Sequence, residues 1–89
     1  MNLERWKTFS KSQQLLMIGS EIMRAKVWQG KDEEKFLGAL ARGMRLIELC
    51  QNDQKWQSAK AMLAGLREEF QKFSTKSRTD DISILYRAL

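Results

Sequence analysis

Apolar residues recur at intervals of three and four positions in three stretches of nearly equal length, which is the spacing of amphipathic α-helices. These stretches cover residues 11–29, 33–51 and 54–73, and a shorter one follows at residues 80–89. The polar connections between the long stretches span two or three residues, and connections this short join antiparallel neighbours. The sequence therefore predicts a single all-α domain over residues 1–89: an antiparallel up-down-up three-helix bundle with a short fourth helix at its C-terminal end.

Residues typical of helix ends stand at these boundaries. Ser10, followed three positions later by a glutamine, forms a capping box before the first helix. Asp32, Asp53 and Thr79 precede the other helices, where a side-chain oxygen accepts a hydrogen bond from a free backbone N–H. Gly30 lies where the first helix is expected to end, because glycine readily adopts the left-handed conformation that terminates helices.

The inward face is clearest in the third helix, where six apolar residues are spaced alternately three and four apart: Trp56, Ala59, Leu63, Leu66, Phe70 and Phe73. Gly38 and Gly43 interrupt the second helix, and each costs about 1 kcal/mol of helix propensity relative to alanine. We therefore expect another helix to approach closely at their level. The antiparallel order also predicts one aromatic cluster at each end of the bundle. The clusters are Trp28, Phe36, Phe70 and Phe73 at one end, and Trp6, Phe9, Cys50 and Trp56 at the other.

The first helix carries more apolar surface than a three-helix bundle needs. One apolar row faces the core, a second row beside it contains Leu16, Met23 and Val27, and Met17 and Trp28 lie outside both rows. A core-facing stripe spans little more than 100°, and this arc spans about twice that. Either the short last helix or a second copy of the chain is expected to cover the remainder. Because two-fold homodimers are the commonest small assemblies, we expect self-association through Leu16, Met17, Met23, Val27 and Trp28.

Charged residues fall at similar heights of the three helices, at Glu21, Arg24, Arg42, Arg67 and Glu68. Arginines and carboxylates that meet in a cleft bind anions such as phosphate. The same residues equally form ion pairs between helices at a solvated surface, where such pairs contribute little to stability. Both interpretations of this polar layer are compatible with the sequence.

The chain is basic, with 16 Lys and Arg against 11 Asp and Glu and a net charge of +5. A positive charge favours acidic partners, nucleic acid among them. Five basic residues gather on the third helix and the loop that follows it: Lys60, Arg67, Lys72, Lys76 and Arg78. No helix-turn-helix, zinc-finger or RNP pattern accompanies them, so any nucleic-acid contact is expected to be with phosphates, weak and sensitive to salt.

The composition argues against several kinds of chemistry. Histidine is absent, which removes the commonest general base and the commonest metal ligand. Cys50 is the only cysteine, so there is no internal disulfide and no cysteine metal site, and no motif for phosphate binding or nucleophilic catalysis occurs. We expect no enzymatic activity, no cofactor and no metal. No apolar run is long enough for a membrane helix or a signal peptide, and we expect a cytoplasmic protein.

Short patterns spread over residues 6–70 resemble a group of short bacterial helical proteins of uncharacterised function. The patterns are Ile18–Ile22 (IGSEI), Arg24–Ala25, Trp28, Leu46–Leu49 (LIEL) and Leu66–Glu68 (LRE). The resemblance implies a bacterial origin and a small helical fold. It implies no activity, cofactor or site residue.

From the sequence we therefore expect a non-catalytic helical protein that acts as a protein–protein interaction module. Its expected partner is a second copy of itself, as a homodimer, or another small bacterial protein. The alternative function is weak binding to the phosphate backbone of nucleic acid through the basic face of the third helix.

Overall fold

The computed structural model describes residues 1–89 and contains helices but no β-strands, which confirms the all-α prediction. The three long segments and a single turn near the N-terminus are α-helical, and two further short segments are 3-10 helices. In chain order the segments are α1 (Leu3–Trp6), α2 (Lys11–Trp28), α3 (Glu33–Gln51), η1 (Gln54–Ala59), α4 (Lys60–Ser74) and η2 (Ile82–Ala88).

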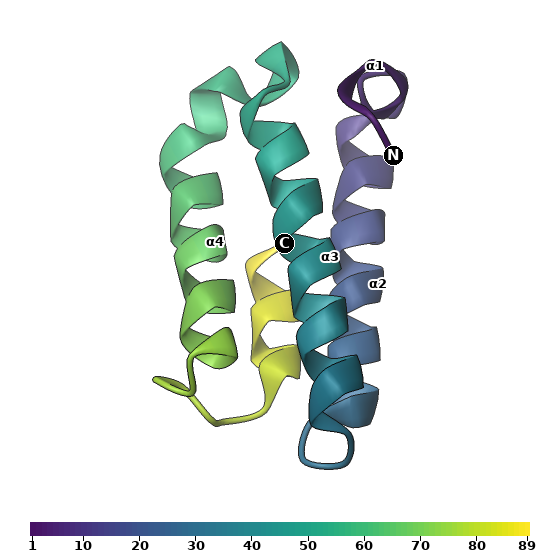
Figure 1. Ribbon diagram of the computed structural model, residues 1–89. Helices are drawn as coiled ribbons and strands as arrows, with labels where there is room; N and C mark the ends of the chain where they lie inside the picture. Colours follow the sequence, from purple (N-terminus) through teal and green to yellow (C-terminus); the bar gives the residue numbers. More distant parts are fainter.

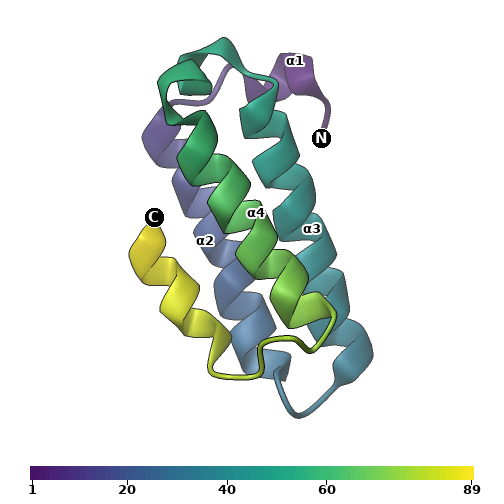
Figure 2. The same cartoon turned by 90° about the vertical axis from the view of Figure 1, so that its left-hand side faces the viewer.

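The long helices alternate in direction. α2 and α3 are antiparallel neighbours, and α4 packs against α3 and runs antiparallel to it (Figure 1). η2 then returns along α2 and also contacts α4, so that it covers part of the surface that the long helices leave open (Figure 2). α1 lies at the end of the molecule where α2 begins (Figure 1). The molecule measures 36 × 23 × 19 Å.

Capping side chains fix the ends of α2 and α3 as the sequence predicts. The hydroxyl of Ser10 accepts a hydrogen bond from the Gln13 N–H at 3.1 Å, and the Gln13 side chain accepts one from the Ser10 N–H at 2.8 Å. Asp32 accepts a hydrogen bond from the Lys35 N–H at 3.1 Å at the start of α3. Gly30, just beyond the end of α2, has a φ of +76°, which is the conformation expected of a glycine that ends a helix.

The predicted third helix over residues 54–73 is wrong at its start, because its first six residues form the 3-10 helix η1. Ala59, the last residue of η1, has φ −115° and ψ 23°, and this non-helical backbone interrupts the chain just before α4. Contacts from distant parts of the chain hold η1 in place. The Trp56 indole N–H donates to the side-chain oxygen of Gln14, and Lys55 donates to two backbone carbonyl oxygens that follow α1, at 3.0 and 2.9 Å. These bonds stabilise a tight turn in place of a continuous α-helix.

The C-terminal segment also differs from the α-helix predicted over residues 80–89. It is a 3-10 helix, Ile82–Ala88, and its cap is Asp81 rather than Thr79. Asp81 accepts a hydrogen bond from the backbone N–H two residues further on, at 2.9 Å. The Gln29 side chain donates to the carbonyl oxygen of Asp80 at 2.7 Å. The same side chain accepts a hydrogen bond from the Ile82 N–H at 2.8 Å, so contacts with the end of α2 hold the start of this segment.

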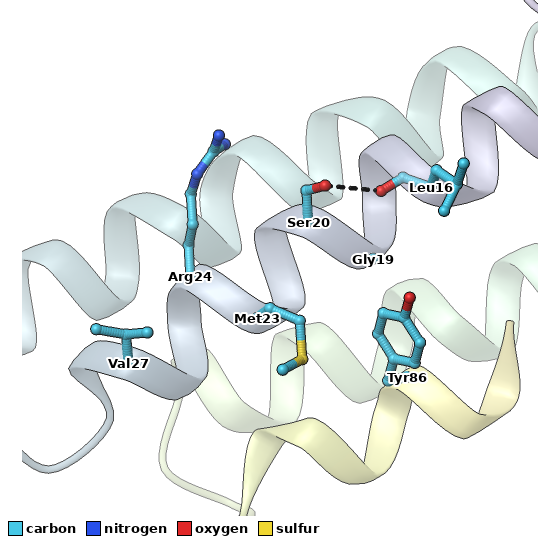
Figure 3. Close-up of a pocket in the computed structure, with 7 residues that line it drawn as sticks. All are labelled: Leu16, Gly19, Ser20, Met23, Arg24, Val27 and Tyr86. Carbon is cyan, nitrogen blue, oxygen red and sulfur yellow. Dashed lines mark hydrogen bonds between the residues drawn. The ribbon is translucent and has the colours of Figure 1, made fainter.

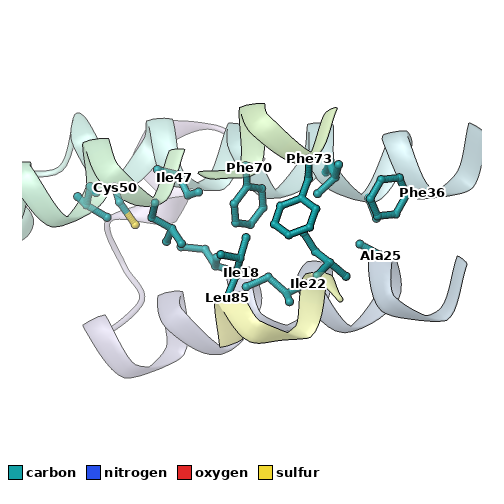
Figure 4. Close-up of a cluster of buried hydrophobic side chains, with 14 of the residues drawn as sticks. Ile18, Ile22, Ala25, Phe36, Ile47, Cys50, Phe70, Phe73 and Leu85 are labelled. Atoms are coloured by element: carbon teal, nitrogen blue, oxygen red, sulfur yellow. The ribbon is translucent and has the colours of Figure 1, made fainter. Parts of the chain in front are cut away.

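Buried apolar side chains from all the main segments form one core (Figure 4). Gly43 of α3 lies so close to the ring of Phe70 of α4 that a Cβ at this position would overlap the ring. The close approach predicted at Gly43 is therefore confirmed. At Gly38 the same prediction is wrong, because only a side chain of α3 itself lies near that glycine. The aromatic contact observed at the α1 end of the molecule joins Trp6 and Phe9, whose ring centroids are 6.4 Å apart in an edge-to-face arrangement.

Candidate protein-interaction surface

One row of α2 faces away from the core and carries exposed apolar side chains. Leu16, Met23 and Val27 of this row, and Tyr86 of η2, are each between 43% and 63% exposed. Figure 3 shows Leu16 and Val27 toward the two ends of a groove, with Met23 and Tyr86 between them. We call this surface the α2 groove. It has a volume of about 340 Å³ and is lined by Leu16, Gly19, Ser20, Met23, Arg24, Val27 and Tyr86.

Gly19 allows η2 to pack closely against α2. A Cβ at this position would lie 2.8 Å from Cε2 of Tyr86, which is closer than Cβ atoms approach neighbouring carbons in folded proteins. η2 is also anchored at its start, where Lys26 Nζ pairs with the Asp81 carboxylate at 2.9 Å and the Ile82 N–H donates to the Gln29 side chain at 2.8 Å. One wall of the α2 groove is therefore held in place while the tyrosine ring stays half exposed.

η2 covers only part of the broad apolar arc of α2. It leaves the three apolar residues of the outward row uncovered. Met17 and Trp28, which were predicted together with that row, lie elsewhere: both are partly buried and pack against the core. Lys35 Nζ lies 4.1 Å from the centroid of the Trp28 ring. The structure thus brings together three of the five predicted interface residues and adds Tyr86. The feature of the sequence that could have indicated Tyr86 is its position on the apolar side of the last segment.

Part of the predicted polar layer meets beside the groove. Glu21 is buried, and its carboxylate accepts hydrogen bonds from Arg24 Nη1 at 2.9 Å and from Arg42 Nε at 3.2 Å. Both arginine side chains are more than half exposed. Arg67 lies apart from this cluster and pairs with a glutamate of α3 at 3.1 Å, and Glu68 is exposed with no ion-pair partner. The predicted layer is therefore not one site, because only Glu21, Arg24 and Arg42 come together.

A depression of about 660 Å³ next to this cluster is lined by Arg24, Trp28, Asp32, Glu34, Lys35, Gly38 and Arg42. Its three cations face two carboxylates, and the buried carboxylate of Glu21 lies against the two arginines. The local charges therefore balance. This balance favours the ion-pair interpretation of the layer over an anion-binding site.

The basic residues considered for nucleic-acid contact are mostly paired with carboxylates of the same chain. The pairs are Arg67–Glu48, Lys72–Glu69, Lys76–Glu33, Arg78–Glu69 and Arg78–Asp80, with N···O distances from 2.6 to 3.1 Å. Hydrogen bonds from Lys72 and Arg78 lower the pKa of Glu69. Lys60 has no acidic partner. The pairing reduces the positive charge that this face presents to a phosphate.

A buried polar network, which sequence reasoning missed, ties α1 and α2 to η1. The Gln14 amide is fully buried, donates to the Trp6 carbonyl oxygen at 2.8 Å and to the Asp53 carboxylate at 3.2 Å, and accepts from Trp56. Lys55 Nζ donates to Asp53 at 2.8 Å. Burial pushes the pKa of Asp53 upward, but the hydrogen bonds from Lys55 and Gln14 outweigh burial, and its pKa is lowered. The sequence does indicate that Gln14 lies on the buried face of α2, because it stands four residues before the first buried isoleucine of that helix.

The surroundings of Cys50 do not activate its thiol. The side chain is fully buried, and burial raises the pKa of the thiol to about 11. No group of three or more acidic or cysteine side chains lies close enough together to hold a metal ion. None of the helices combines the length and the apolar character that crossing a bilayer requires.

Family models, curated proteins and solved structures give no match to this chain.

Proposed function

We propose that this protein is a non-catalytic protein–protein interaction module that self-associates through the α2 groove. The observation that carries the proposal is the grouping of Leu16, Met23, Val27 and Tyr86, each about half exposed, in one groove. Single exposed apolar side chains are common on protein surfaces, whereas the largest contiguous set of them is often a functional surface. We interpret the architecture as a three-helix bundle of α2, α3 and α4 in which η2 is a short fourth segment that forms one wall of this site.

The size of the groove sets the strength of the expected association. Four apolar side chains, each about half exposed, offer on the order of 400 Å² per chain. Two copies would bury on the order of 800 Å² plus a polar rim, which is less than the roughly 1,200–2,000 Å² of stable complexes. We therefore expect a weak dimer with a dissociation constant between micromolar and millimolar.

The charges beside the groove allow two copies to meet. The chain carries a net charge of +5, so repulsion between copies opposes association in general. Two cations flank the outward row of α2, and each has a carboxylate partner in its own chain: Arg24 pairs with Glu21, which it shares with Arg42, and Lys26 pairs with Asp81. Contact along this row therefore brings neither cation into the interface without a carboxylate partner.

The alternative proposal is binding to a phosphate backbone through Lys60, Arg67, Lys72, Lys76 and Arg78. It has less support, because all of these except Lys60 already pair with carboxylates of the chain. Phosphate contacts would have to compete with those pairs. Their salt dependence distinguishes this alternative from an apolar interface.

Sedimentation equilibrium of a Met23→Lys variant tests the proposed function. Met23 is exposed, so the variant is expected to fold, as far-UV circular dichroism would check. Leu37→Lys is the matched control, since Leu37 is an exposed apolar residue of α3 that does not line the groove. Burying the lysine in an apolar contact costs more than 1.4 kcal/mol, so we expect Met23→Lys to weaken association at least tenfold. The control is expected to associate like the wild type.

Two results would contradict the proposal. In one, Met23→Lys associates as strongly as the wild type and Leu37→Lys. In the other, the purified chain is a monomer that carries material absorbing at 260 nm, which is released by high salt. The second result favours the nucleic-acid alternative.

A further inference from the structure

We infer that two copies of the chain pair through α2 in an antiparallel arrangement, about a two-fold axis that passes α2 between residues 21 and 22. In this arrangement Leu16 lies opposite Val27 of the second copy, and Ser20 lies opposite Met23 of the second copy. The inference rests on the proposed self-association and specifies its geometry, which the proposed function leaves open.

The spacing along α2 carries the inference. Leu16, Ser20, Met23 and Val27 all line the groove and follow one another at intervals of four, three and four positions. These intervals read the same in both chain directions. A row with this symmetry superimposes on itself when a second α2 is turned end for end, and an isologous interface requires such a self-complementary surface. Intervals of four and three also keep the four residues on one side of the helix, as in packed helix pairs.

The side chains that this register brings together differ in size as packing requires. Ser20 is the smallest of the four, and the long thioether side chain of Met23 fills the space beside it as a knob fills a hole. The Ser20 hydroxyl donates to the Leu16 carbonyl oxygen at 2.9 Å within α2 (Figure 3). Covering Ser20 with an apolar side chain therefore leaves no polar group unpaired.

The two ends of the row complete the match. Leu16 and Val27 are the most exposed apolar side chains of the groove, at 63% and 54%. In the antiparallel register Leu16 of each copy covers Val27 of the other copy, so this contact occurs twice per dimer. Arg24 and Lys26 border the contact, and each keeps a carboxylate partner within its own chain, Glu21 (shared with Arg42) and Asp81.

A parallel pair is the competing arrangement. It would place Ser20 against Ser20 and Met23 against Met23. Two small polar side chains would then face each other at one level, and two large apolar side chains would face each other at the next. It would also align the two helix dipoles in the same direction, whereas the antiparallel pair opposes them favourably. Both comparisons favour the antiparallel pair.

Disulfide trapping between two full-length variants tests the register. Leu16→Cys and Val27→Cys are prepared separately, one of them isotope-labelled, and are then mixed and oxidised at a concentration where the wild type sediments as a dimer. A disulfide forms only when the two Cα atoms lie within about 7 Å of each other. In the antiparallel pair the two copies of position 16 lie about 17 Å apart, which is eleven residues at a rise of about 1.5 Å each. The native Cys50 does not interfere, because it is fully buried with a thiol pKa of about 11.

Mass spectrometry of the oxidised mixture distinguishes the outcomes. We expect the mixed Leu16→Cys/Val27→Cys dimer to exceed either homodimer at least tenfold, and a Leu37→Cys variant to give no cross-link above that of the wild type. A dominant Leu16→Cys homodimer would show a parallel pair and overturn the inference. A dimer in sedimentation without any cross-link would refute the register while self-association stands. A monomer at every concentration would refute the proposed function itself.

Discussion

Replacing Gly43 by alanine measures how closely α3 and α4 pack. On helix propensity alone the substitution would stabilise the protein by about 1 kcal/mol, because glycine is a poor residue inside a helix. The structure predicts the opposite sign. The added methyl group would overlap the Phe70 ring, and that ring is fully buried in the core. It cannot swing aside into solvent, so α3 and α4 must separate or the core must repack.

Overpacking of this kind costs up to about 3 kcal/mol. After the gain in propensity, we expect Gly43→Ala to lower the free energy of unfolding by about 2 kcal/mol. For a chain of this length that corresponds to a fall in Tm of about 8–16 °C. Gly65→Ala is the matched control, because Gly65 is a helical residue of α4 with no atom within 4 Å of its Cβ position. We expect the control to raise the stability by about 0.5–1 kcal/mol.

Urea unfolding followed by circular dichroism measures both variants. A Gly43→Ala protein as stable as the wild type would refute the close packing, since the two glycines would then behave alike. A Phe70→Leu background sharpens the result. Removing the ring removes the overlap, so in that background Gly43→Ala should no longer be destabilising, and the coupling between the two positions should reach about 2 kcal/mol.

Three further predictions concern the polar groups. Asp53→Asn should destabilise the protein by on the order of 1–3 kcal/mol at neutral pH. The pKa of Asp53 is lowered from 3.8, so the stability that its carboxylate contributes is present above that pH and is lost as the carboxylate protonates at lower pH. The difference in free energy of unfolding between variant and wild type should therefore shrink in urea unfolding near pH 3. A difference that stays constant with pH would contradict this. Arg24→Ala and Arg42→Ala each leave Glu21 with one cation, whereas the double variant leaves its buried carboxylate with none. The double variant should therefore lose at least about 1 kcal/mol more free energy of unfolding than the two single variants together. Additive losses in thermal unfolding would refute the shared pairing. Cys50, with a thiol pKa of about 11, should react with a thiol reagent near pH 8 only as fast as the protein unfolds, and rapid modification of the native state would show that the site is open.

The extent of the main helices could be predicted because local residues determine it. The capping box at Ser10, the N-cap Asp32 and the terminating Gly30 act through bonds or backbone conformations within a few residues. The break at Ala59 could not be predicted in the same way. The apolar spacing of the third helix continues through it, and the bond that holds η1 joins Trp56 to Gln14, 42 residues earlier. Such a contact leaves no periodic signal.

The sequence indicated that an apolar interaction surface exists on α2, but it did not indicate correctly which residues form it. The excess width of the apolar arc on α2 indicated that something beyond the bundle must cover it. Which part η2 covers depends on the contact between Gly19 and Tyr86, which pairs distant segments. Met17 and Trp28 appeared equivalent to the outward row because helix periodicity gives only angular position. Their packing against the core depends on neighbouring segments that the pattern of one helix does not describe.

The central claim is that the α2 groove is where two copies of this chain meet. A dilution series of two-dimensional amide NMR spectra, from millimolar to micromolar protein, tests it most directly, because each backbone amide reports its own surroundings. The account predicts concentration-dependent shifts confined to the outward row from Leu16 to Val27 and to Tyr86, with the exposed face of α3 around Leu37 unchanged. Spectra that do not change with concentration, or shifts that centre on α3 or α4, would contradict it.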